Sequence, residues 1–202
     1  MKKKIGIGLL ISLVLVGGIF AFNSNVQMMA QIMYLNTIET TTFTVEGNQL
    51  FMNGEINSKT PQQLKEVVEA NPNITTIVML DVPGSCDDEA NLPMATWVRN
   101  QGLNTYLTKT SHVASGGTDF FLAGVNRTME EGAQIGVHSW SDGMKEAKDV
   151  PKNDPAHEMN RKYIEDMLGK DDFYWYTIYA APASDIHYMT AEEIHTFQLV
   201  TQ

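Results

Sequence analysis

One apolar run, residues 74–82 (ITTIVMLDV), constrains the fold of this chain more than any other segment. It is rich in β-branched side chains and lacks the polar alternation of a strand that has one face in water. A strand of this kind is buried on both faces, as in a parallel sheet, and parallel strands need crossover connections, usually helices. The run therefore predicts an α/β domain.

Turn and helix signals on both sides of this run predict that strands and helices alternate along the chain. The other expected strands share β-branched or apolar residues and are residues 40–45, 50–52, 105–108, 127–129 and 135–138. The expected helices share apolar residues at helical spacing or capping residues, and are 62–70, 89–101, 118–124, 155–168, 171–180 and a last one beginning at 191. Residues 139–154 are rich in Ser, Asp, Gly, Lys and Pro and predict a loop.

The N-terminus predicts export from the cytoplasm. Residues 5–22 carry no charge and follow three lysines, and as a helix they would measure about 27 Å, enough to cross a bilayer core. We expect a signal anchor or a cleaved signal peptide at 1–22, a polar juxtamembrane stalk at 23–39 and an α/β domain at 40–202. The domain would then lie in the cell envelope, either inner-membrane anchored and facing the periplasm or outside, or secreted to the periplasm.

Charge and cysteine content exclude several classes of function. The chain has 24 acidic and 14 basic residues, and three of the basic ones precede the apolar segment, so the domain is strongly acidic. Such a surface repels phosphate backbones, which argues against nucleic-acid binding. The single cysteine, Cys86, allows no internal disulfide and no multi-thiolate metal site. We expect neither a metal nor a cofactor.

Three polar features lie where predicted strands end, which is where open α/β sheets build their sites. They are the turn at residues 81–85, the segment 112–118 (HVASGGT), and His138 at the end of a strand. Ser115 could merely cap the following helix, but the small residues on both sides would let the backbone approach a ligand or another strand closely.

Together these features resemble the Clp peptidase and crotonase superfamily, and within it the exported Clp-protease-like proteins of bacteria. The motifs that carry the resemblance are GEI at 54–56, PGS at 83–85, the turn at Ser115, FLAG at 121–124 and IGVH at 135–138. They extend over roughly residues 40–200. The resemblance implies a spiral of ββα units and an assembly into trimers, hexamers or rings.

The resemblance also implies a catalytic triad, with Ser115 as nucleophile, His138 as base and Asp185 as the acid that orients the histidine. The third position stays open, because Asp142, Asp171 and Asp172 are alternatives. A lysine base, as in membrane-bound signal-peptide peptidases, would have to be Lys109, which precedes the serine on the incoming strand.

An oxyanion hole would be formed by backbone N–H groups of Gly84, Ser85 and Gly116. The family has a second glycine where this chain has Ser85, and if that position needs a positive φ, serine disfavours it. Two main hypotheses for the function follow. The protein is a serine hydrolase that cleaves peptides or unfolded segments, or it is a catalytically impaired binding or scaffold protein. An acyl-CoA enzyme of the crotonase branch is disfavoured by the compartment and by the acidic surface.

Overall fold

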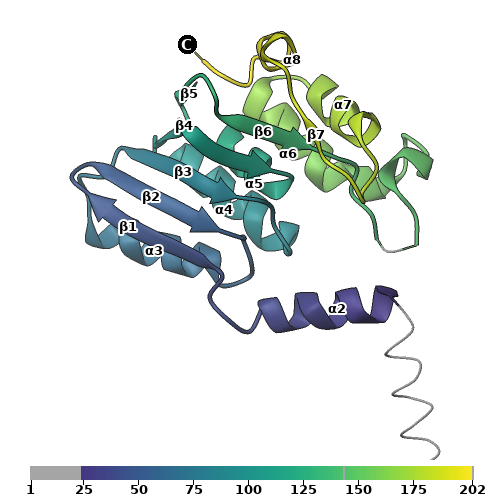
Figure 1. Cartoon of the computed structure of the whole chain (residues 1–202), viewed down its shortest axis with the longest axis horizontal. Helices are drawn as coiled ribbons and strands as arrows, with labels where there is room; N and C mark the ends of the chain where they lie inside the picture. The colour runs from purple at the N-terminus through teal and green to yellow at the C-terminus, as the bar shows by residue number, and fades with distance from the viewer. Residues whose placement is uncertain (1–23, 143, 202) are drawn as a thin grey trace, which may run out of the picture.

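The computed structural model describes residues 24–142 and 144–201 (Figure 1). Its centre is a seven-stranded sheet with the order β1-β2-β3-β4-β6-β7, in which β5 pairs with β4 outside this path. Residues 5–22, the expected membrane segment, lie outside the described residues. Among the helices that are described, none has the length and apolar character needed to cross a bilayer.

The strands confirm the predicted α/β architecture. β1 (Thr41–Glu46) and β2 (Gln49–Gly54) form an antiparallel hairpin, as the turn residues between them predict. β2, β3 (Thr76–Val82), β4 (Asn104–Ala114) and β6 (Gln134–Val137) are parallel, β5 (Arg127–Met129) pairs in parallel with β4, and β7 (His187–Tyr188) closes the sheet in antiparallel fashion. Ile77, Val78 and Met79 of β3 are all buried, as expected of a strand covered on both faces.

Helices pack mainly against one face of this sheet, behind the strands in the view of Figure 1. They are α3 (Thr60–Ala70), α4 (Asp88–Asn100), α5 (Gly116–Leu122), α6 (Glu158–Leu168), α7 (Asp172–Ala180) and α8 (Ala191–Thr196). The core between the layers includes Leu107 of β4, Phe120 and Phe121 of α5, and Ile135 of β6, all fully buried. The expected stalk contains α2 (Ser24–Leu35), whose end is fixed by hydrogen bonds from Asn57 Nδ2 to Leu35 O at 2.7 Å and Ile38 O at 2.8 Å.

The fourth strand differs from its prediction. The sequence predicts a strand at 105–108 followed by a turn, whereas β4 continues to Ala114. Its pairing with β3 changes register between Met79 and Asp81, so the extra residues of β4 form an irregularity and the strand resumes beyond it. Ser111 Oγ stabilises this irregularity by donating to Met79 O at 2.5 Å and accepting from the Thr108 N–H at 2.9 Å. The strand therefore ends directly before Ser115.

The start of α5 lies in very close contact with the end of β3. A Cβ atom on Gly117 would overlap the backbone carbonyl of Val82, and one on Gly116 would overlap the Ser85 side chain. Only glycine leaves room for this approach, in agreement with the close backbone contact that the small residues around Ser115 predict. The contact fixes the serine turn against the turn at 83–85.

We expect Gly117→Ala to destabilise the fold by about 1–3 kcal/mol, because the added methyl group collides with backbone rather than with a movable side chain. Urea unfolding measures the effect. The matched control is Gly84→Ala, where the new Cβ would meet the Ser115 Cβ at an ordinary 3.6 Å. The same unfolding midpoint for both variants would contradict the close packing of α5 on β3.

Candidate active site

Ser115 occupies a strained turn between β4 and α5. Its φ of 52° and ψ of −128° make it one of two non-glycine residues with positive φ in the described parts of the chain. The Ser115 N–H donates to Gly136 O at 3.1 Å, and Ser115 O accepts from the Thr118 N–H at 2.8 Å, so its peptide groups are held on both sides. Such a conformation costs about 1–3 kcal/mol and persists only where the surroundings impose it. A strained strand-to-helix turn exposes the nucleophile in α/β-hydrolases.

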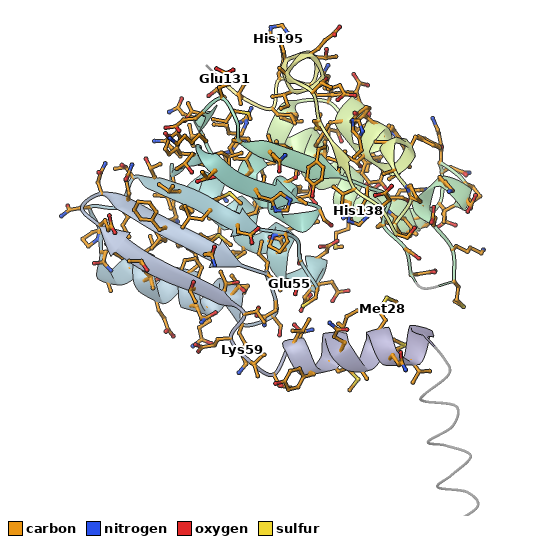
Figure 2. The ribbon with its side chains drawn as sticks, viewed as in Figure 1. Met28, Glu55, Lys59, Glu131, His138 and His195 are labelled. Carbon is orange, nitrogen blue, oxygen red and sulfur yellow. The ribbon has the colours of Figure 1, made fainter. Side chains whose placement is uncertain are left out.

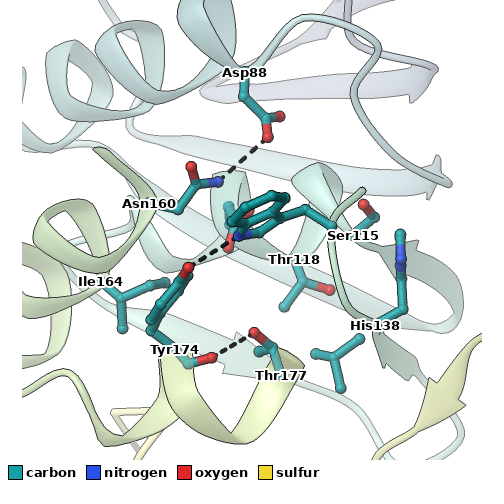
Figure 3. Close-up of a pocket in the computed structure, with 11 residues that line it drawn as sticks. Asp88, Ser115, Thr118, His138, Asn160, Ile164, Tyr174 and Thr177 are labelled. Atoms are coloured by element: carbon teal, nitrogen blue, oxygen red, sulfur yellow. Dashed lines mark hydrogen bonds between the residues drawn. The ribbon is translucent and has the colours of Figure 1, made fainter. Parts of the chain in front are cut away.

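His138 follows β6 and lines the same pocket as Ser115 (Figure 3). Its Nδ1 lies 2.7 Å from the backbone oxygen of Ser139. A carbonyl oxygen can only accept, so Nδ1 carries the proton in the neutral ring and Nε2 is left with a free lone pair. No hydrogen bond joins this histidine to the Ser115 hydroxyl in the described structure. Catalytic contacts are often long before substrate binds.

The structure does not bring Asp185 to His138. Asp185 is exposed, and its carboxylate accepts from the neighbouring Ile186 N–H at 2.8 Å. The three alternative aspartates are also engaged elsewhere: Asp142 accepts from the amides of Met144 and Lys145, Asp171 pairs with Arg161, and Asp172 pairs with Lys170. The backbone oxygen of Ser139 occupies the place at Nδ1 that the expected acid would take.

Lys109 does not serve as a base in this geometry. It is exposed on β4, its backbone N–H donates to Glu130, and it does not line the pocket. The described residues around the pocket include no lysine.

The turn that follows β3 lies directly beside Ser115. A Cβ on Gly84 would lie 4.0 Å from the Ser115 Oγ, and the Ser85 nitrogen would lie 3.0 Å from a Cβ on Gly116. The amides of Gly84, Ser85 and Gly116 donate no hydrogen bond within the described part of the chain. Ser85 has an ordinary backbone conformation, since it is absent from the residues with positive φ. The serine in place of the second glycine therefore causes no strain in φ at this position.

Two carboxyl groups of this pocket were not identified from the sequence. Asp88 begins α4 and accepts from Asn160 Nδ2 at 3.3 Å, and Asp119 lies one turn after Ser115 in α5. Burial raises the pKa of Asp119 to about 8, and the negative charge of Asp88 adds to the effect. Burial also raises the pKa of Asp88. The spacing of four residues from the serine is the one signal that could have indicated Asp119.

Other reactive side chains give no second site. Burial raises the pKa of the Cys86 thiol to about 11, so it is protonated at neutral pH and a poor nucleophile. His187 is bonded to Glu193, which also accepts from the Thr190 N–H as part of a capping box. No group of three or more metal-ligating side chains occurs in the residues that the structure describes.

Comparisons with known proteins identify the fold. No family model and no curated protein matches the sequence. Among solved structures, a serine-to-alanine mutant of 1510-N, a membrane-bound stomatin-specific protease, is 17% identical with a TM-score of 0.52 and covers 76% of this chain and 75% of its own. PA4980 of Pseudomonas aeruginosa is 12% identical, with a TM-score of 0.52 and coverage of 81% and 76%. An enoyl-CoA hydratase of Geobacillus kaustophilus is 14% identical, with a TM-score of 0.50 and coverage of 81% and 67%.

The class that these observations define is a mixed α/β fold similar to Clp-peptidase and crotonase-like structures. This confirms the fold-level part of the resemblance seen in the sequence. At such low identity the likeness concerns the fold alone, and an argument about chemistry has to come from the residues of the pocket.

We expect Ser115→Gly to stabilise the chain by about 1 kcal/mol, because glycine relieves the positive φ and only part of that gain is offset by its larger unfolded-state entropy. Chemical unfolding at one pH checks this. A control at the exposed Ser58, which has no positive φ, should gain nothing from the same substitution. A loss of stability in Ser115→Gly would show that the serine turn is unstrained.

The stability of the fold should fall as pH rises from about 5 to 8. Asp119 has a raised pKa in the folded state, so the folded chain binds more protons than the unfolded chain between about pH 4 and pH 8. One such proton gives a slope of up to about 1.4 kcal/mol per pH unit. Asp119→Asn resembles the protonated form and should flatten this pH dependence, whereas Glu131→Gln, at an exposed turn (Figure 2), should leave it unchanged. Denaturant titrations across this range measure the slope, and an unchanged slope in Asp119→Asn would refute the assignment.

Proposed function

We propose that this protein is a serine hydrolase that cleaves peptide bonds, with Ser115 as nucleophile and His138 as general base. The observation that carries the proposal is the strained serine itself. It stands at the junction of β4 and α5, opens onto a pocket and shares that pocket with a histidine of fixed tautomer. A serine that merely capped a helix would need no positive φ, and Ser115 makes no side-chain cap hydrogen bond.

The chemistry follows from the two side chains. As Ser115 Oγ attacks the substrate carbonyl, His138 Nε2 takes the hydroxyl proton and then passes it to the leaving amine. The backbone oxygen of Ser139 keeps Nδ1 protonated and accepts from the imidazolium, the part played by a carboxylate in a full triad. Water then releases the acyl group by the same steps in reverse. The hydroxyl and Nε2 have to come within hydrogen-bond distance when substrate binds, while Nδ1 keeps its contact with Ser139 O.

The negative charge of the tetrahedral intermediate would be met by backbone amides. The N–H groups of Gly116 and of the turn at Gly84 and Ser85 lie beside the serine and have no protein acceptor in the described residues. Removing one donor of this kind from an oxyanion hole costs about 3 kcal/mol in other enzymes. The close contact between α5 and β3 would hold these donors in place without reorganisation.

The substrate class and cellular location belong to the same proposal. The protease 1510-N is described as membrane-bound and stomatin-specific, which favours a peptide substrate for the similar fold here. We propose that residues 5–22 tether or export the domain, which would then act in the cell envelope, alone or as a homo-oligomer. The acidic charge of the domain is consistent with a partner other than nucleic acid.

Labelling with a fluorophosphonate probe tests the proposal. We expect the wild-type chain to be labelled, Ser115→Ala to lose all labelling, and His138→Ala to slow labelling by at least about 100-fold. Ser58→Ala is the matched serine control, and Asp185→Asn should react within about twofold of wild type because it does not contact the histidine. A folded wild-type chain that resists the probe would favour the alternative, a non-catalytic binding or scaffold protein.

A further inference from the structure

The polar groups around the Ser115 pocket can be accounted for one by one. Thr118 Oγ1 donates to Gly136 O at 2.8 Å, and Thr177 Oγ1 donates to Tyr174 O at 2.8 Å. The Tyr174 hydroxyl accepts from Trp140 Nε1 at 2.9 Å and is bonded to the ring of His157 at 2.6 Å. These groups are satisfied by the protein itself, so they have little capacity left for a ligand.

Apart from the Ser115 hydroxyl, His138 Nε2 and the amide of Asn160, the unused capacity of the pocket's side chains belongs to its carboxyl groups, above all to Asp119. Asp119 has no side-chain hydrogen bond to any of the described residues, and it lines the pocket as a half-buried residue. Asp88 accepts a long hydrogen bond from Asn160 Nδ2 at 3.3 Å and shares a second side-chain hydrogen bond with Ser85, so part of its capacity is already used. Once Asp119 is ionised it can only accept, so the group that completes the pocket in that state is a donor. Since burial of two carboxylates is unfavourable, a donor that carries positive charge is favoured most.

The size and lining of the pocket indicate which kind of donor can bind there. Asp119 lies one helical turn after Ser115, and the Asp119 N–H donates to Ser115 O at 3.2 Å. A rise of about 6 Å over these four residues is within reach of an extended lysine side chain. The walls include the apolar side chains of Val137 and Ile164, and the cavity is small at about 50 Å³. It therefore suits an unbranched methylene chain that ends in a compact charge better than a planar guanidinium.

We propose that this pocket is the specificity site of the enzyme and that it takes the lysine side chain of the residue whose carbonyl meets Ser115. The methylene groups pack against Val137 and Ile164, and the ammonium lies between Asp119 and Asp88. This assignment rests on the proposed function, because it places the scissile carbonyl at the serine. It names Asp119 as the residue that determines specificity.

The surrounding charges agree with a cationic ligand. The titratable groups that face Asp119 are Asp88 from α4, Tyr163 from α6 and Tyr174 from α7, with His138 at the end of β6. Apart from the histidine, no basic side chain of the described chain lines the pocket. The ammonium group would therefore act as the counter-ion of the two carboxylates, with no lysine or arginine side chain in the pocket lining to compete with it.

The test uses two readouts on the full chain. The first is kcat/KM for a matched pair of acylated esters, one of lysine and one of norleucine, which has the same methylene chain without the charge. The second is equilibrium binding of the corresponding peptides to the Ser115→Ala variant, followed by NMR, which needs no hydrolysis. We expect lysine to be preferred at least about tenfold in both. Asp119→Asn should reduce the preference to within about twofold, and the exposed-carboxylate control Glu131→Gln should retain it.

Binding of the lysine peptide should also depend on pH, and binding of the norleucine peptide should not. Because the ammonium binds the ionised carboxyl, affinity for the lysine peptide should rise between pH 6 and pH 8.5 in the chain with Asp119, and affinity for the norleucine peptide should not. Equal binding of the two peptides, or a lysine preference that survives in Asp119→Asn, overturns the specificity assignment. If neither ester is hydrolysed but the lysine peptide still binds selectively, the proposed hydrolase activity is wrong and the assignment of a cation-binding pocket is retained.

Discussion

The close packing of α5 on the end of β3 is the constraint on which the rest of this site depends. Because Gly117 has no side chain, the first turn of the helix can approach the carbonyl of Val82, and Gly116 can approach Ser85. This approach places two turns from different crossovers beside each other. Ser115 adopts a positive φ at this junction, and the amides of Gly84, Ser85 and Gly116 are left without a protein acceptor in the described residues. The strain at the serine is thus a consequence of packing that the core stabilises.

The sequence predicted those parts of the fold that local pattern determines. Buried strands such as β3 carry their own signal, and turn residues marked the hairpin of β1 and β2. The extension of β4 to Ala114 could not be foreseen, because Ser111 bonds to Met79 only after the two strands are paired. Ser115 and His138, by contrast, can be predicted from the sequence because they lie next to the ends of strands. Asp119 looked like one more polar residue of a short helix, because its importance comes from what α6 and α7 place around it.

In the proposed mechanism, the backbone oxygen of Ser139 takes the role that a carboxylate has in a full triad. The Ser139 carbonyl fixes the tautomer as well as a carboxylate would, so the free Nε2 is available in the neutral ring. A carbonyl has no net charge, however, and it stabilises the imidazolium less than an aspartate does. A hydrolase built in this way would be a weaker base catalyst, and it would rely more heavily on its oxyanion donors. Asp185, exposed and bonded to its own chain, cannot compensate.

If Ser115 is the nucleophile that we propose, the acidic groups beside it would create an electrostatic conflict that substrate can resolve. Ionised Asp88 and Asp119 would oppose the negative charge that develops on the substrate oxygen, and that opposition is stronger in a partly buried pocket than in open solvent. Holding Asp119 protonated in the free protein removes part of the conflict, as its raised pKa indicates. A cationic side chain would remove the rest, because it neutralises the carboxylates as the carbonyl meets Ser115. Selectivity and transition-state stabilisation would then come from the same contact, since a neutral side chain fills the space without cancelling the charge.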